Sequence, residues 1–133
     1  MAHRTIRYYV DYWAQQSPEK TFLIAPEPDI SMTFKELQEK SLRLAKKLND
    51  KGIYKNDKVS FMCPNGYQST RLFLGIMYGG FVVSPINIAA QIKHLEHIIE
   101  HSDTKLIFVT DNYKDKVNQA LKNVSRDVEV VNI

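Results

Sequence analysis

The chain has 133 residues, of which 44% are hydrophobic and 25% charged, and a net charge of +3. It is long enough to form one domain, or part of a larger one, with a buried core. The 18 basic residues are interleaved with 15 acidic residues, whereas nucleic-acid-binding proteins concentrate their basic residues in a patch or arm, so no nucleic-acid partner is expected. The densest basic stretch, from Lys35 to Lys58, is expected to form the solvated face of a helix.

The single cysteine, Cys63, excludes an intrachain disulfide framework and a metal site built from cysteines. The N-terminal residues do not have the apolar stretch of a signal peptide, and the longest apolar runs are too short to cross a bilayer. We therefore expect a cytoplasmic protein without a membrane span.

Hydrophobic periodicity, together with Gly and Pro as breaks, predicts alternating helices and strands. The first part of the chain is predicted to contain a helix with Ile6, Tyr9, Val10 and Trp13 on one face and its end at Ser17-Pro18, a strand over 21–25, a turn at Pro26 and Pro28, and a short strand near Ser31. Thr33 and Glu36 then form a capping box, in which each side chain accepts a free backbone N–H of the helical turn. This helix carries an apolar stripe and is expected to end at Gly52.

The second part alternates more regularly. We predict buried strands over 59–63 and 81–84, and further strands over 106–110 and 128–131. One helix is predicted to follow Gly66, one to start near Ile92 and end near Ser102, and one to be capped by Thr110 or Asp111. Pro64-Asn65-Gly66, Gly79-Gly80 and Pro85 are the expected breaks. This alternation implies parallel strands joined by helical crossovers. The expected fold class is α/β, with three layers: a mostly parallel sheet and helices on both faces.

Open α/β sheets bind ligands at the carboxyl ends of their strands, but the loops expected there carry no familiar phosphate cradle. The five glycines cannot build GxGxxG or GxxxxGK[ST], which argues against a small flavodoxin-like nucleotide binder. Pro64-Asn65-Gly66-Tyr67 places backbone N–H groups at a helix start, as any strand-to-helix turn does, so a structural role is favoured. The strand that ends Met62-Cys63-Pro64 does not have the acidic residues of a receiver domain, and Cys63 is expected to be a buried, inert thiol.

Three histidines share one face of a predicted helix, at the spacing that metal ligands would require: His94, His97 and His101. The apolar stripe of that helix lies on the opposite side. We therefore expect three exposed imidazoles and no metal site.

Five segments of the sequence have the residue pattern of known motifs. Met32 to Leu37 combines a small hydroxylic residue, an aromatic residue and Glu-Leu. The others are Gly52 with Lys55 to Val59, Pro64-Asn65, Gly75 to Asn87, and Leu95 to Val109. In this order and spacing they resemble the core motifs of the adenylate-forming (AMP-binding) acyl-CoA synthetase/ligase family. The resemblance extends from about Tyr12 to Asn132.

The resemblance implies a two-step reaction carried out by a longer parent enzyme. A carboxylate attacks the α-phosphate of ATP with the help of Mg²⁺, giving acyl-AMP and pyrophosphate, and the thiol of CoA then displaces AMP. The family's phosphate loop, ribose-binding Asp and C-terminal Lys are not found in these 133 residues. Residues 1–133 are therefore expected to be an N-terminal α/β subdomain, a fragment that is inactive alone and binds no cofactor by itself.

The resemblance also suggests a subclass. Residues 85–89 depart from the Pro-Leu-Asp pattern of amino-acid-activating modules and look more like acyl- or aryl-CoA ligases, which implies a small carboxylic acid substrate and a place in fatty acid metabolism. In some acetate-activating members, arginines after the equivalent of the 106–110 strand hold CoA phosphates. Lys114 and Lys116 are the corresponding candidates here, with a solvated helix face as the alternative role.

The expected partner is the remainder of the parent enzyme. A homodimer through the face that the fragment leaves exposed is a further expectation, because a charge of +3 is too small to prevent association. A stand-alone, non-catalytic α/β binding or scaffold domain stays open as the alternative function.

Overall fold

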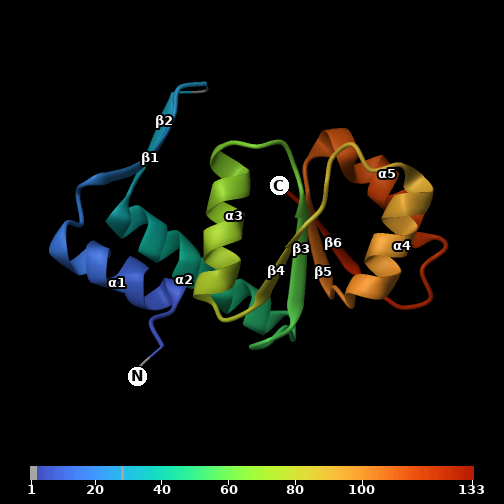
Figure 1. Cartoon of the computed structure of the whole chain (residues 1–133), viewed down its shortest axis with the longest axis horizontal. Coiled ribbons are helices and arrows are strands. Elements are labelled where there is room, and N and C mark those ends of the chain that lie inside the picture. Colours follow the sequence, from blue (N-terminus) through green and yellow to red (C-terminus); the bar gives the residue numbers. More distant parts are fainter. Residues whose placement is uncertain (1–2, 28) are drawn as a thin grey trace. The chain divides into compact units, whose positions relative to one another are not determined.

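The computed structural model describes residues 3–27 and 29–133, and these residues divide into two compact units. The first unit holds residues 3–27, 29–55 and 65–81, and the second holds Asn56–Pro64 and Val82–Ile133. Figure 1 labels the elements of both units. Pro28, one of the two prolines of the predicted turn, lies outside the described residues.

The first unit consists of three helices and an antiparallel pair of strands, which are α1 (Ile6–Gln16), α2 (Phe34–Asp50), α3 (Tyr67–Tyr78), β1 (Thr21–Ala25) and β2 (Ile30–Thr33). The capping box predicted at the start of α2 is confirmed. Thr33 Oγ1 accepts the Glu36 N–H at 3.2 Å, and the Thr33 N–H donates to Glu36 Oε2 at 2.8 Å. Gly52, just beyond the end of α2, has a φ of +79°, as a left-handed C-terminal residue requires.

The core of the first unit forms where the three helices and β2 meet. Val10, Met32, Leu37 and Tyr78 are its buried residues. Helices α2 and α3 approach closely at Gly75, where a Cβ atom would lie 2.8 Å from Leu44 Cδ2. The small residue therefore sets the spacing of this helix pair.

The second unit is built on a parallel sheet of four strands, with the order β4-β3-β5-β6. Its elements are β3 (Lys58–Met62), β4 (Val82–Pro85), α4 (Ile92–Ser102), β5 (Leu106–Val109), α5 (Asp111–Leu121) and β6 (Glu129–Asn132). Figure 1 shows α4 and α5 side by side along the sheet. Residues of both helices share a buried cluster with Met62, Ile86, Ile107 and Val109. The predicted α/β class, a parallel sheet flanked by helices, is confirmed.

One strand differs from its prediction. The strand expected to be buried over 81–84 is β4, which covers 82–85 and lies at an edge of the sheet, with Val82 43% exposed. The strand ends at Pro85, which is its last residue, and an edge strand tolerates a residue without an N–H because it pairs on one side only. The pattern of apolar residues predicts a strand there, but it does not reveal the order of the strands.

Candidate functional site

Polar residues gather at the carboxyl edge of the parallel sheet in the second unit. Asn87 follows β4, and its side-chain oxygen accepts the Ala89 N–H at 2.9 Å. Asn132 ends β6 and donates to the Asp111 carboxylate, next to the end of β5, at 2.8 Å. Thr110 is the N-cap residue of α5, but its buried Oγ1 makes no hydrogen bond to the described residues. This edge can bind a polar ligand through side-chain amides and a carboxylate, and it offers no glycine-rich cradle.

The two lysines predicted as CoA-phosphate candidates lie on α5 in different surroundings. Lys114 is exposed. Lys116 is partly buried, and its Nζ donates to the carbonyl oxygen of Ala90 at 3.1 Å. Lys114 and Lys116 are two positions apart on a helix, so their side chains point in nearly opposite directions. They therefore cannot both bind the same phosphate. Their role in binding CoA stays a prediction.

The three histidines of α4 are exposed, as predicted. The rings of His97 and His101 lie 4.2 Å apart between centroids. Within residues 3–27 and 29–133, no three His, Cys, Asp or Glu side chains are arranged to hold a metal ion. The expectation that the histidines bind no metal stays a prediction.

The strand-to-helix turn after β3 uses its polar groups internally. Gly66 has φ +154° and ψ −152°, a backbone conformation that essentially only glycine adopts. Its N–H donates to Ser69 Oγ at 2.9 Å, so this group is already bonded within the protein. Cys63, directly after β3, is buried as predicted. Both observations favour the structural role that the sequence suggests for this turn.

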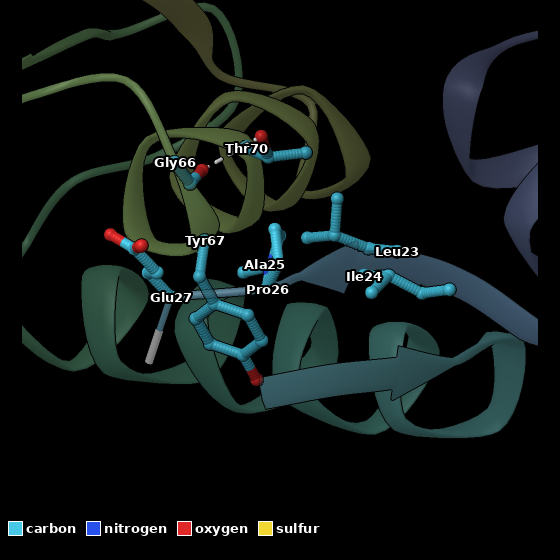
Figure 2. Close-up of a pocket in the computed structure, with 8 residues that line it drawn as sticks. All are labelled: Leu23, Ile24, Ala25, Pro26, Glu27, Gly66, Tyr67 and Thr70. Carbon is cyan, nitrogen blue, oxygen red and sulfur yellow. Dashed lines mark hydrogen bonds between the residues drawn. The ribbon is translucent and has the colours of Figure 1, made fainter. Parts of the chain in front are cut away.

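A cavity of about 350 Å³ lies in the first unit between β1 and the start of α3. Figure 2 shows its lining, which is Leu23, Ile24, Ala25, Pro26, Glu27, Gly66, Tyr67 and Thr70. Thr70 Oγ1 donates to the Gly66 carbonyl at 2.9 Å, so the Glu27 carboxylate and the Tyr67 hydroxyl are the remaining polar side-chain groups of a largely apolar wall. Sequence reasoning missed this cavity because it joins segments about forty residues apart, neither of which carries a ligand-binding motif.

Sequence reasoning also missed a polar cluster that joins the three helices of the first unit. Asp11 Oδ1 accepts the Tyr78 hydroxyl at 2.6 Å and the Gln38 amide at 2.9 Å. Arg7 Nε lies 3.7 Å from Asp11 Oδ2. Burial raises the pKa of Tyr78 to about 12; the hydrogen bond and charge of Asp11 add to this shift and Arg7 opposes it. Each of α1, α2 and α3 contributes a residue to this cluster. Its hydrogen bonds therefore hold the three helices together.

None of the helices in the part of the chain that the structure describes is long and apolar enough to cross a membrane.

Comparison with known proteins points in one direction. The model of the AMP-binding enzyme family matches residues 10–133. The sulfoacetate–CoA ligase of Cupriavidus necator is 36% identical over 118 residues, which cover 89% of this chain and 23% of that protein. A medium/long-chain-fatty-acid–CoA/3-oxocholest-4-en-26-oate–CoA ligase of Mycobacterium marinum is 31% identical over 104 residues, or 78% of this chain and 18% of that protein.

A solved structure shows the same fold. The benzoate CoA ligase of Burkholderia xenovorans superposes with a TM-score of 0.84 at 22% identity, over 97% of this chain and 26% of that one. The present chain spans less than a quarter of the length of the two curated relatives, at 23% and 18%.

Proposed function

Because the chain belongs to the AMP-binding enzyme family, we propose that residues 1–133 are the N-terminal α/β segment of an ATP-dependent acyl- or aryl-CoA ligase. The match of the family model over residues 10–133 carries the proposal. The two CoA ligases that are 36% and 31% identical to this chain support it. Since both are more than four times as long as the stretch they share with it, the activity belongs to a longer parent protein.

The parent would join a small carboxylic acid to CoA in two steps. The carboxylate displaces pyrophosphate from ATP to give acyl-AMP, and the CoA thiol then displaces AMP to give the thioester. We assign to this chain the α/β layer that backs the substrate cleft, and a cytoplasmic place in acyl-CoA and fatty acid metabolism. The described residues offer no set of three side chains suited to a metal, so no step through Mg²⁺ is assigned to them.

Lys114 and Lys116 are the candidates in this chain for contact with CoA phosphates. Lys114 is exposed at the start of α5, whereas Lys116 is engaged with Ala90. In the parent enzyme, Lys114→Gln should raise the KM for CoA several-fold and leave the KM for ATP unchanged. Lys122→Gln, at the other end of α5, is the matched control. An unchanged KM for CoA would indicate that Lys114 lies on a solvated helix face and does not contact CoA.

Exchange of labelled pyrophosphate into ATP tests the proposal directly. The 133-residue chain should show no carboxylate-dependent exchange, because the family's phosphate loop and C-terminal Lys are not in it. The same chain extended by its downstream coding sequence should show exchange with a range of carboxylic acids, followed by CoA-dependent release of AMP. Exchange by the 133-residue chain would contradict the assigned role. An extended protein without exchange would favour a non-catalytic scaffold.

A further inference from the structure

The turn before α3 contains the one asparagine of the chain that is followed by glycine, Asn65 with Gly66. Both residues are exposed, and Gly66 is the N-cap residue of α3. We propose that Asn65 is a site of spontaneous deamidation, and that the hydroxyl group of Ser69 restrains the reaction in the folded chain.

Deamidation of an asparagine starts with attack by the protein's own backbone. The backbone nitrogen of the next residue loses its proton to hydroxide or water and attacks the asparagine Cγ. A bond forms between this nitrogen and Cγ, the bond between Cγ and Nδ2 breaks, and Nδ2 takes a proton from water and leaves as ammonia. Water then opens the resulting succinimide ring at either of its carbonyl groups, which gives aspartate or isoaspartate. Water is therefore the only co-reactant.

The residue after the asparagine controls how easily the ring closes. A side chain there crowds the attacking nitrogen, and glycine has none. Apart from its chain neighbours, no heavy atom lies within 4 Å of the place that a Cβ atom of Gly66 would occupy, so ring and water have room. Asn87, Asn123 and Asn132 differ in both respects: each is followed by isoleucine or valine, and each side-chain amide makes a hydrogen bond.

In the folded chain, the attacking nitrogen is held by Ser69. The Gly66 N–H donates to Ser69 Oγ at 2.9 Å, and the same hydroxyl donates to the Gly66 carbonyl at 3.0 Å. Ser69 is only 9% exposed, so water competes little for its hydroxyl. A bonded N–H is harder to deprotonate and to turn toward Cγ of Asn65, and the hydrogen bond therefore slows ring closure.

The atoms that carry this restraint are close together in the sequence. They lie within residues 65–69, which all belong to the first unit. The restraint is therefore local and does not require a segment beyond Ile133.

The two products would change the turn in different ways. Aspartate places a negative charge one residue before the N-cap of α3, where the helix dipole favours it. Isoaspartate adds a methylene group to the main chain and so lengthens the connection between β3 and α3. Either product lowers the net charge of the chain from +3 to +2, because a neutral amide becomes a carboxylate.

Incubation of the 133-residue chain in mildly alkaline buffer tests the proposal. Peptide mass mapping should find conversion of amide to carboxyl at Asn65 before any other asparagine, at a rate that rises with pH. A protein-isoaspartate methyltransferase should label the same peptide. Ser69→Ala should speed the conversion about two- to tenfold, the range expected for the loss of one ordinary hydrogen bond.

Thr70→Val is the matched control for the folded chain. Thr70 Oγ1 donates to the Gly66 carbonyl at 2.9 Å (Figure 2), so this variant removes a hydroxyl from the same turn and leaves the bond to the Gly66 N–H in place. It should convert at the wild-type rate. In urea, wild type and Ser69→Ala should convert equally fast, because unfolding removes the hydrogen bond. Circular dichroism in buffer checks that both variants are folded.

Different results would overturn the two parts of the proposal. Equal rates for folded wild type and Ser69→Ala, equal acceleration by Thr70→Val, or a difference between wild type and Ser69→Ala that persists in urea would each show that the Ser69 hydrogen bond does not restrain the reaction. Conversion at another asparagine before Asn65, or none at Asn65 in urea, would show that Asn65 is not the deamidation site.

Discussion

The glycines beyond the ends of α2 and α3 are needed for different physical reasons. Gly52 has a φ of +79°, and a Cβ atom there would meet nothing within 4 Å. Glycine is therefore needed at position 52 for its backbone conformation and not for lack of space. Asn also adopts a positive φ, so Gly52→Asn should cost little stability. Gly79 has an ordinary helical φ of −71°. A Cβ atom there would collide with the Phe81 ring, lying 2.8 Å from its Cδ2, and would approach Ala45 Cβ at 3.1 Å.

We therefore expect Gly79→Ala to destabilise the chain by about 1–3 kcal/mol, because the buried Phe81 ring cannot move aside without strain. Gly52→Asn is the matched control and should change the free energy of unfolding by less than about 0.5 kcal/mol. Urea unfolding followed by circular dichroism measures both. A Gly79→Ala variant as stable as the wild type would show that Phe81 can be repacked.

Tyr78 makes stability depend on pH in the alkaline range. Its pKa rises from the ordinary 10.0 to about 12 in the folded chain, so the protonated phenol favours the folded state. This contribution is complete below pH 10 and is lost as the pH rises through about 12. It amounts to at most about 3 kcal/mol, since one pKa unit corresponds to about 1.4 kcal/mol.

Tyr78→Phe should therefore flatten the loss of stability between about pH 9 and pH 12. Tyr9→Phe, a change at an exposed tyrosine of α1, should keep the slope of the wild type. Urea unfolding across this pH range measures the effect. If wild type and Tyr78→Phe show the same slope, a group other than Tyr78 causes the loss of stability at alkaline pH.

At the scale of elements, the end of α4 depends on the segment after α5. Asp103 ends α4 in the left-handed conformation, with a φ of +56°, where glycine is more usual. Arg126 donates to the carbonyl oxygens of Ile99 and Thr104 near this end. Glu100 on α4 accepts the Ser125 N–H at 2.8 Å and the Ser125 hydroxyl at 2.5 Å. These contacts join the two helices beyond their apolar packing.

The hydrogen bonds from Ser125 hold the pKa of Glu100 below its usual value of 4.5. A lowered carboxyl pKa contributes stability above the ordinary pKa and loses it as the pH falls through the folded value. Glu100→Gln should therefore lower the melting temperature at neutral pH, and the difference from wild type should shrink under acid conditions. Glu39→Gln, at an exposed carboxylate of α2, should show no such pH dependence. Scanning calorimetry at several pH values checks this, and a constant difference would rule it out.

At the scale of the whole molecule, local sequence patterns predicted the helices and strands. They did not predict the contacts between residues that are distant in the sequence. The capping box at Thr33, the stop at Gly52 and the apolar stripes each act within a few residues, so the sequence alone reveals them. The edge position of β4 depends on the order in which strands pair, and the Asp11–Tyr78 hydrogen bond joins residues 67 apart. Neither follows from a periodic pattern.

The candidate site shows the same division. Sequence reasoning placed Lys114 and Lys116 on one helix and the three histidines on one exposed face, because helical spacing fixes both. It did not find the contact of Lys116 with Ala90 or the cavity beside Glu27 and Tyr67. Both join segments whose own residues carry no motif, so only the folded backbone brings them together.

The sheet edge carries a last expectation, about self-association of the chain. Strand β4 pairs with β3 on one side only, and Val82 is 43% exposed on this edge. Open edge strands are templates for pairing with another copy, and a net charge of +3 gives little repulsion. We expect the chain to dimerise as its concentration rises, which sedimentation velocity measures. Val82→Lys should shift the chain toward monomer, because a charge on an edge strand opposes pairing.

The exposed tyrosines of α1 provide the control for this expectation. Replacing both Tyr8 and Tyr12 by Ala should leave the dimerisation constant unchanged if the sheet edge is the contact. If only the tyrosine changes abolish the dimer, the contact between the two copies lies at α1 and not at the sheet edge. A clean monomer at the highest concentration, with no binding of a hydrophobic dye, would contradict the expectation and favour a self-sufficient scaffold domain.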